Sequence, residues 1–134
     1  MVEDALVKEP LTESMIELGA QLTHKLVESG VDVSVAMWFF LSGANRWRLF
    51  FSSPEMSTKG SRPIYERIER VRRELPCPDQ LPLSSIGLLD PTNQLVNGLR
   101  LSVGALPGIT RVRYTNGAAH GQYIDDALIY RIAA

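Results

Sequence analysis

The residues best suited to bind an anion lie in a polar loop, Ser52–Ser61, between a predicted strand and a predicted helix. Free backbone N–H groups and the helix dipole attract negative charge at a helix start. The loop lacks the Gly-x-x-x-x-Gly-Lys-Ser/Thr spacing of a phosphate-binding P-loop, and capping or turn roles are the competing interpretation. The pattern predicts a candidate anion site made of Ser57, Thr58, Lys59, Gly60 and Ser61.

A second polar turn, Leu89–Asn93, follows the next predicted strand. If the two strands before these loops are parallel, both loops lie at one end of the sheet, where α/β proteins commonly bind ligands. Asp90 in this turn would partly oppose an anion. The loop and the turn together support an alternative function for the chain: binding of an anion or a nucleotide, with or without enzymatic activity.

Acid–base chemistry is suggested by His120, followed closely by Asp125 and Asp126. A histidine beside carboxylates can transfer protons in catalysis. The two aspartates point to opposite faces if they lie on a strand, so they do not easily serve one site. The sequence therefore assigns none of the three a chemical role.

Metal and nucleophile chemistry has equally little support. His24 and Glu28 are one helical turn apart, but two ligands do not close a metal site. Cys77 has no neighbour in sequence whose positive charge would activate the thiol. We predict no catalytic residue, no metal site and no cofactor, and the chain is expected to be non-enzymatic.

The clearest structural signal is a hairpin. Residues 31–41 alternate in a long β-type pattern, Ser42–Asn45 is turn material, and residues 46–51 alternate again. The second face of this hairpin combines aromatic side chains with arginines, which suits a protein interface and also resembles platforms for single-stranded nucleic acid. The interface candidates are Trp38, Phe40, Arg46, Arg48 and Phe50.

The length of the hairpin loop decides which residues share a face. A loop with an odd number of residues places Phe39 and Leu41 with Trp47, Leu49 and Phe51 on one apolar face. A slip by one residue would turn a whole apolar row towards water. We therefore expect an odd loop, with Trp38 and Phe40 left outside the main core.

Helical and strand patterns continue along the chain. Residues 11–30 predict a helix capped by Thr12, residues 61–75 a second helix, and residues 90–104 a third that begins at Asp90-Pro91. Strands are expected at 83–89, 109–115 and 123–132, with a loop at 116–121. The predicted fold class is α+β, in the order α-β-β-α-β-α-β-β, with a five-stranded mixed sheet and right-handed crossovers.

Length and composition favour one domain over residues 1–134, with residues 1–10 a loose lead-in. The single cysteine rules out an internal disulfide and fits a reducing compartment. We recognise no signal peptide and no apolar run of about 20 residues, the length that spans a bilayer. The expected location is the cytoplasm, without a membrane role.

The net charge of −1 hides an uneven distribution, because residues 1–32 have two Lys against seven acids and residues 46–74 have eight basic residues against four acids. Such polarity can draw copies of a protein together. Together with the aromatic hairpin, it makes self-association, as a homodimer, or binding to another protein the first expected function. Nucleic-acid binding through the hairpin face ranks third, because the chain is slightly acidic overall.

Overall fold

The computed structural model describes residues 7–119 and 121–133, which form one α+β fold around a five-stranded mixed sheet. The predicted order of main elements is confirmed, with one short helix and two 3-10 turns added. The elements are α1 (Glu13–Glu28), β1 (Val35–Leu41), β2 (Arg46–Ser52), α2 (Met56–Lys59), α3 (Arg62–Arg72), η1 (Pro78–Gln80), η2 (Leu83–Ser85), β3 (Ile86–Leu88), α4 (Gln94–Ser102), β4 (Val112–Ala119) and β5 (Gln122–Ile132).

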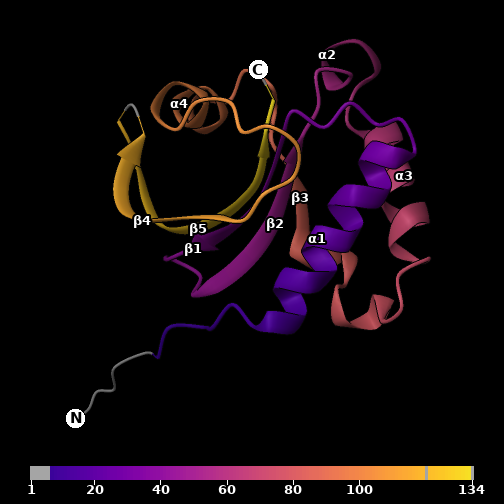
Figure 1. The fold of residues 1–134 in the computed structure, drawn as a ribbon, viewed down its shortest axis with the longest axis horizontal. Coiled ribbons are helices and arrows are strands. Elements are labelled where there is room, and N and C mark those ends of the chain that lie inside the picture. The colour runs from indigo at the N-terminus through magenta and orange to yellow at the C-terminus, as the bar shows by residue number, and fades with distance from the viewer. Residues whose placement is uncertain (1–6, 120, 134) are drawn as a thin grey trace.

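The strands lie in the order β3-β2-β1-β5-β4. β2 and β3 are parallel, and the other neighbouring pairs are antiparallel. Consequently β2, β3 and β5 run in one direction and finish at the same end of the sheet, where β1 begins. We call this the carboxyl end of the sheet. Helices α1 and α3 pack on one face, and α4 lies on the other, inside the curl of β4 and β5 (Figure 1).

Only the first of the two crossovers joins parallel strands. The segment between β2 and β3 returns to a neighbouring parallel position, as predicted. The segment after β3 carries α4 across the sheet to β4, which lies at the opposite edge and runs antiparallel to β3. This long path is what brings α4 over the second face of the sheet.

Helix α1 forms where its sequence predicts it. The hydroxyl of Thr12 accepts a hydrogen bond from the backbone N–H of Met15, which caps the first turn. Gly30, with φ at 94°, ends the helix in a conformation that side chains rarely adopt. The apolar stripe, with Leu22 and Leu26 fully buried, packs against the sheet.

The prediction of an odd hairpin loop is wrong. Leu41 pairs with Arg46, so the loop contains four residues and Phe40 lies opposite Trp47. Phe39 and Leu41 therefore lie on the face opposite to Trp47. The prediction assumed that Phe39 and Leu41 form the buried row, but Trp38 and Phe40 pack in the core with Trp47, Leu49 and Phe51. Both rows of β1 are apolar, so the even register also buries a complete apolar row.

The same register divides the predicted interface residues between two faces. Trp38 and Phe40 are 1% and 4% exposed and lie beneath α1 and the N-terminal segment, inside their own chain. They are unavailable to a partner, so the prediction that Trp38 and Phe40 form an interface is wrong. Arg46, Arg48 and Phe50 lie on the other face and are exposed or half-buried.

Several boundaries also differ from those predicted. Asn93, whose side chain accepts from the N–H of Leu95, caps α4, whereas the Asp90 carboxylate accepts from Thr92 in the preceding turn. The predicted strand at 83–89 is shortened by a 3-10 turn, and β4 extends through most of the predicted loop at 116–121. Within the described residues, every helix is too short or too polar to cross a bilayer.

Helix α4 approaches the β4–β5 hairpin at Gly98. A Cβ atom there would lie 2.5 Å from the backbone oxygen of Ala119, a distance that requires the helix or strand to move. We expect Gly98→Ala to lower the free energy of unfolding by about 1–3 kcal/mol through overpacking, although alanine is the better helix former. Urea denaturation measures this change. Gly43→Ala is the control, because nothing lies within 4 Å of a Cβ at Gly43; equal effects would contradict close packing at Gly98.

Candidate functional site

A hollow of about 350 Å³ opens at the carboxyl end of the sheet. Pro54 follows β2 and Pro91 follows β3, as expected for two parallel strands whose loops lie at one end. Arg100 reaches the hollow from α4. We call this the edge hollow, and its lining residues are Asp32, Ser34, Pro54, Pro91, Arg100 and Ala133.

Buried polar atoms without partners distinguish the edge hollow. Ser34 is 8% exposed, and its backbone is fixed by hydrogen bonds to Ser52 and Ala133, each 2.8 Å long. Within residues 7–119 and 121–133, the hydroxyls of Ser34 and Ser52 and the Nε atom of Arg100 have no hydrogen-bond partner. The same holds for the Nε atom of Arg48, in the middle of β2, but only Ser34 and Arg100 line the edge hollow. Most buried polar groups in proteins are hydrogen-bonded, so these two atoms facing one hollow indicate a place for a polar ligand.

The charges around the edge hollow come from different elements. Arg100 is half-buried in the last turn of α4, while Asp32 is exposed at the rim. The second arginine nearby, Arg131, is already used: its Nε atom donates to the backbone oxygen of Val33 at 2.6 Å. Arg100 is therefore the cation best placed to meet a negatively charged ligand in this hollow.

The rim is held by a contact between α2 and the chain before β1. The backbone N–H of Asp32 donates to the Glu55 carboxylate at 3.0 Å, and this bond, with a smaller contribution from Lys59, holds the pKa of Glu55 below its ordinary value. Lys59 lies 3.4 Å from the other oxygen of Glu55. The Glu55 side chain thus fixes the position of Asp32 at the rim.

None of the five residues of the predicted anion site lines the edge hollow. Ser57, Thr58 and Lys59 form the single turn of α2, and Lys59 is paired with Glu55. Gly60, at φ 79°, makes the bend into α3, where the side chain of Ser61 forms no capping hydrogen bond. The predicted loop begins at the end of the sheet where the edge hollow lies, but its five predicted residues are not among the side chains around the hollow.

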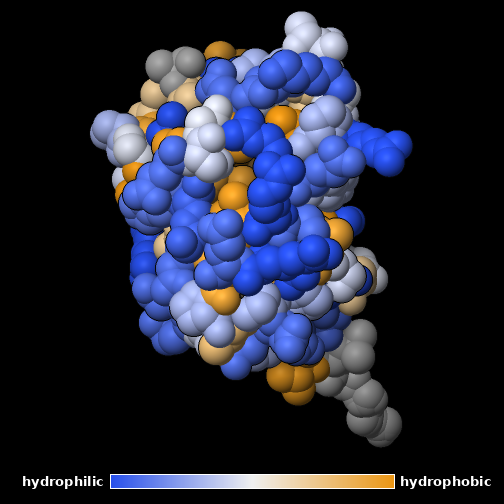
Figure 2. Space-filling model, turned by 90° about the vertical axis from the view of Figure 1, so that its right-hand side faces the viewer, coloured by the Kyte–Doolittle hydropathy of each residue, from blue (hydrophilic) through white to orange (hydrophobic). Residues whose placement is uncertain are grey.

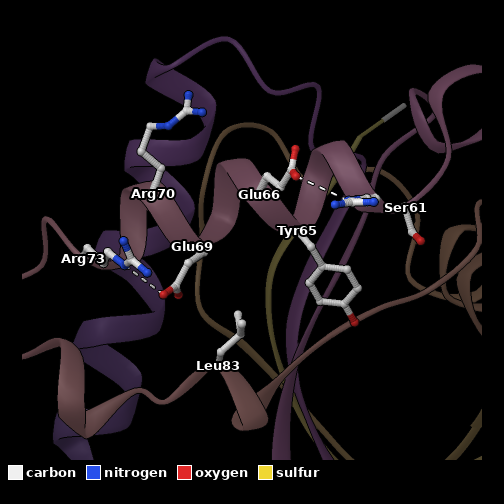
Figure 3. Close-up of a pocket in the computed structure, with 8 residues that line it drawn as sticks. Ser61, Tyr65, Glu66, Glu69, Arg70, Arg73 and Leu83 are labelled. Atoms are coloured by element: carbon white, nitrogen blue, oxygen red, sulfur yellow. Dashed lines mark hydrogen bonds and ion pairs between the residues drawn. The ribbon is translucent and has the colours of Figure 1, made fainter.

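A larger groove of about 580 Å³ runs along the outer side of α3 and includes Ser61, Tyr65 and Leu83 (Figure 3). The charged side chains of this groove largely form ion pairs with neighbouring side chains. Glu69 pairs with Arg72 at 2.6 Å and with Arg73 at 3.0 Å, and the Arg72 hydrogen bond lowers the pKa of Glu69. The side of the molecule seen in Figure 2 is mostly hydrophilic with separate apolar patches. This groove is an open surface whose charged side chains form ion pairs with one another, so it does not have the features of a binding site.

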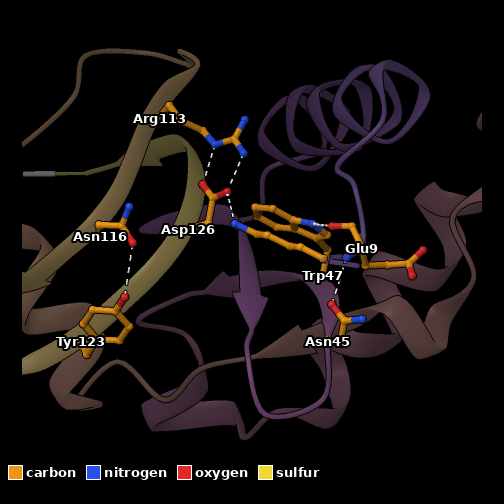
Figure 4. Close-up of polar contacts among 8 residues, drawn as sticks. Glu9, Asn45, Trp47, Arg113, Asn116, Tyr123 and Asp126 are labelled. Atoms are coloured by element: carbon orange, nitrogen blue, oxygen red, sulfur yellow. Dashed lines mark hydrogen bonds and ion pairs between the residues drawn. The ribbon is translucent and has the colours of Figure 1, made fainter. Parts of the chain in front are cut away.

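Asp126 lies in a structural cluster on the α1 side of the sheet (Figure 4). Its carboxylate is 5% exposed and bonds with Lys8 at 2.8 Å and with Arg113 at 2.6 and 2.7 Å. Burial raises the pKa of Asp126, but the bonds from Arg113 and Lys8 outweigh it and hold the pKa below its ordinary value. The carboxylate is fully engaged in ion pairs and has no geometry for proton transfer.

The N-terminal segment is fixed by the same cluster. The indole N–H of Trp47 donates to the backbone oxygen of Glu9 at 2.8 Å, and Asn45 bonds to Glu9 and to Val7 (Figure 4). The ammonium group of Lys8 lies 5.7 Å from the Trp47 ring centre, a cation–π distance. Residues 7–10, predicted to belong to a loose lead-in, are therefore held against the hairpin.

The other predicted chemical residues are not brought together. His120 lies outside the described residues, while Asp125 lines a hollow on the face opposite to Asp126, as the strand pattern predicts. Cys77 is exposed and forms no disulfide within the described part of the chain. No group of three His, Cys, Asp or Glu side chains among residues 7–119 and 121–133 is placed to hold a metal ion.

Sequence reasoning missed Ser34 and Arg100 because neither belongs to a motif. Ser34 comes in a bend just before β1, and Arg100 is separated from it by 65 residues of intervening chain. The available signal was topological: parallel β2 and β3 mark the carboxyl end of the sheet as a ligand position. Comparison of the chain with known families, with curated proteins and with solved structures yields no match.

Proposed function

We propose that this protein binds a small oxyanion, a molecule bearing a phosphate or carboxylate group, in the edge hollow. The observation that supports this proposal is the pair of atoms without hydrogen-bond partners on the lining residues, the buried hydroxyl of Ser34 and the Nε atom of the half-buried Arg100. A guanidinium donates to the oxygens of carboxylate and phosphate with matching geometry. The place also agrees with the usual ligand position of sheets with helices on both faces.

The size of the edge hollow limits the ligand. At about 350 Å³ it is near the lower end of the range for small-molecule pockets, about 300–1,000 Å³. Asp32 at the rim opposes additional negative charge but can accept a hydrogen bond from a ligand hydroxyl or amine. A compact molecule with one anionic group and one donor fits this charge arrangement better than a polyanion.

The proposal predicts a response to small oxyanions. Phosphate, sulfate or malonate should raise the melting temperature more than chloride at matched ionic strength, because a ligand that binds only the folded state stabilises it. Arg100→Gln should remove most of this difference while keeping a side chain of similar length. Differential scanning fluorimetry on the full chain measures both, and the comparison of phosphate with malonate separates the two ligand types.

Lys59→Ala is the matched control, since it removes a cation at the same end of the sheet without touching the edge hollow. Its response to oxyanions should equal that of the parent. If Lys59→Ala loses the response and Arg100→Gln keeps it, the site is the Ser52–Ser61 loop instead. If the parent shows no response, the proposal fails.

We also propose the cytoplasm as the compartment. An exposed cysteine without a disulfide partner, Cys77, suits a reducing environment. Labelling of intact and lysed cells with a membrane-impermeant thiol reagent tests this placement, and labelling of Cys77 in intact cells would contradict it.

A further inference from the structure

Helix α4 covers only part of its face of the sheet. Met37, Ala127 and Ile129 lie beneath it and are fully buried. Towards the β1–β2 loop, the same face carries Phe39 and Leu41, which are half-buried, and Tyr123, which is 64% exposed, lies beside them at the edge of the depression there. We call the uncovered part the open face, formed by Phe39, Leu41, Arg46, Arg48 and Phe50, with Asp125 and Tyr123 at its margin.

The centre of the open face is apolar and hollowed. A depression of about 400 Å³ is lined by Phe39, Leu41 and Tyr123, with Asp125 at its side. The ring of Phe39 meets that of Phe50 edge to face, with the ring centres 6.3 Å apart. Aromatic and aliphatic side chains grouped on one exposed face mark an interaction surface more often than an inert one.

Opposite charges flank this centre in a row across three strands. Arg46 on β2 pairs with Leu41 on β1. On the other side of β1, Phe39 pairs with Ala127, and Asp125, two residues before Ala127, lines the depression together with Leu41. The row therefore reads Arg46, Leu41, Asp125, with a cation at one end, an apolar residue in the middle and an anion at the other end.

We infer that a second copy of this chain docks on the open face as a symmetric dimer. A two-fold axis that lies in the plane of the contact, above Leu41 and parallel to β1, exchanges the two ends of the row and sets Arg46 of each copy against Asp125 of the other. Such a closed pair uses one self-complementary patch and is the commonest form of self-assembly. The apolar centres then bury each other, and Tyr123 lies at the margin of the contact.

The contacts already made by these residues allow this pairing. Arg46 donates one hydrogen bond, to the backbone oxygen of Ser84 at 3.0 Å, and a guanidinium has five N–H donors in all. No ion pair involving Asp125 is formed within the described chain. The presence of Asp125 also makes the open face mixed in charge, which favours a second copy over nucleic acid.

Charge reversal tests the dimer and its orientation together. The parent should sediment as a dimer in the micromolar range. Arg46→Glu and Asp125→Arg should each weaken dimerisation by at least about tenfold, because like charges then face each other twice. The double variant Arg46→Glu/Asp125→Arg restores both pairs and should return the dissociation constant close to that of the parent.

Tyr123→Ser should also weaken the dimer, whereas Leu101→Ser should leave it unchanged. Leu101 is a matched control because it is 69% exposed and lies on α4, outside the open face. A parent that stays monomeric throughout the micromolar range would overturn the inference and leave this face for a different protein. A double variant that dimerises no better than the single ones would overturn the two-fold arrangement. Neither outcome bears on the separate proposal that Arg100 binds an oxyanion.

Discussion

Trp38→Ala is expected to lower the free energy of unfolding by about 3–5 kcal/mol, the range for deleting a large aromatic side chain from a core. The Trp38 side chain is fully buried between α1 and the sheet. Its indole N–H donates to the backbone oxygen of Met15 at 3.2 Å and to the hydroxyl of Tyr130 at 3.1 Å. The substitution removes a large volume and also leaves a buried hydroxyl short of a donor. Urea denaturation followed by far-UV circular dichroism measures the change.

The neighbouring residue provides the control. Phe39 lies on the opposite face and is only half-buried, so Phe39→Ala should cost about 0.75–1.5 kcal/mol, half the value for full burial of a phenylalanine. An odd hairpin loop would give Phe39 the large effect instead, and the structure excludes that register. A loss at Phe39 equal to that at Trp38 would contradict the burial described above.

Trp38 also shows why α1 requires a glycine at its centre. A Cβ atom at Gly19 would lie 2.6 Å from the indole nitrogen of Trp38 and 2.6 Å from the hydroxyl of Tyr130. The hydroxyl of Tyr130 donates in turn to the backbone oxygen of Ile16, and its burial raises the pKa of that phenol. The helix is thus fastened to the sheet by two aromatic side chains that reach its backbone.

Local patterns predicted the elements well, because each element carries its own periodicity and caps. Residues 13–28 show one apolar stripe, a threonine cap and a terminal glycine, and they form α1 close to the expected bounds. The hairpin register could not be predicted in this way. It depends on which row of β1 packs beneath α1, and both rows of β1 carry large apolar side chains.

The candidate site was predictable only as a location. Parallel β2 and β3 require their following loops to share one end of the sheet, and Pro54 and Pro91 do meet there. The side chains that face the edge hollow come from a bend and from the last turn of a helix. Their convergence depends on the path of α4 across the sheet, which no local pattern encodes. Lys59 looked suitable in sequence because its partner, Glu55, was not evident.

The second large effect is expected at Asp126 when both its cationic partners are removed. In the double variant Lys8→Met/Arg113→Met, the apolar stems remain but the buried carboxylate loses both ion pairs. Removing the partners of a buried charge typically costs about 3–5 kcal/mol, so the free energy of unfolding at neutral pH should fall by roughly this amount. Urea denaturation of the parent and the variant across a pH series measures it.

The contribution of the Asp126 carboxyl group to the pH dependence of stability should also change sign. In the parent, the ion pairs hold the pKa of Asp126 below its unfolded value, so their stabilisation is complete above the unfolded pKa and is lost as pH falls through the folded pKa. In the double variant only burial remains, and burial raises the pKa of a carboxyl group. The folded variant then takes up a proton at a higher pH than the unfolded chain, so its stability should increase as pH falls towards the unfolded pKa.

A third substitution identifies Asp126 as the source of both effects. Lys8→Met/Arg113→Met/Asp126→Asn has no buried charge in the cluster, and an amide of the same shape replaces the carboxylate. Its stability at neutral pH should recover most of the loss, since exchanging a whole buried ion pair for neutral groups costs much less than breaking it. The pH profile of its free energy of unfolding should lack the contribution of the Asp126 carboxyl group. A triple variant as unstable as the double one would show that Lys8 and Arg113 act through their contacts with Phe40 and Trp47 instead.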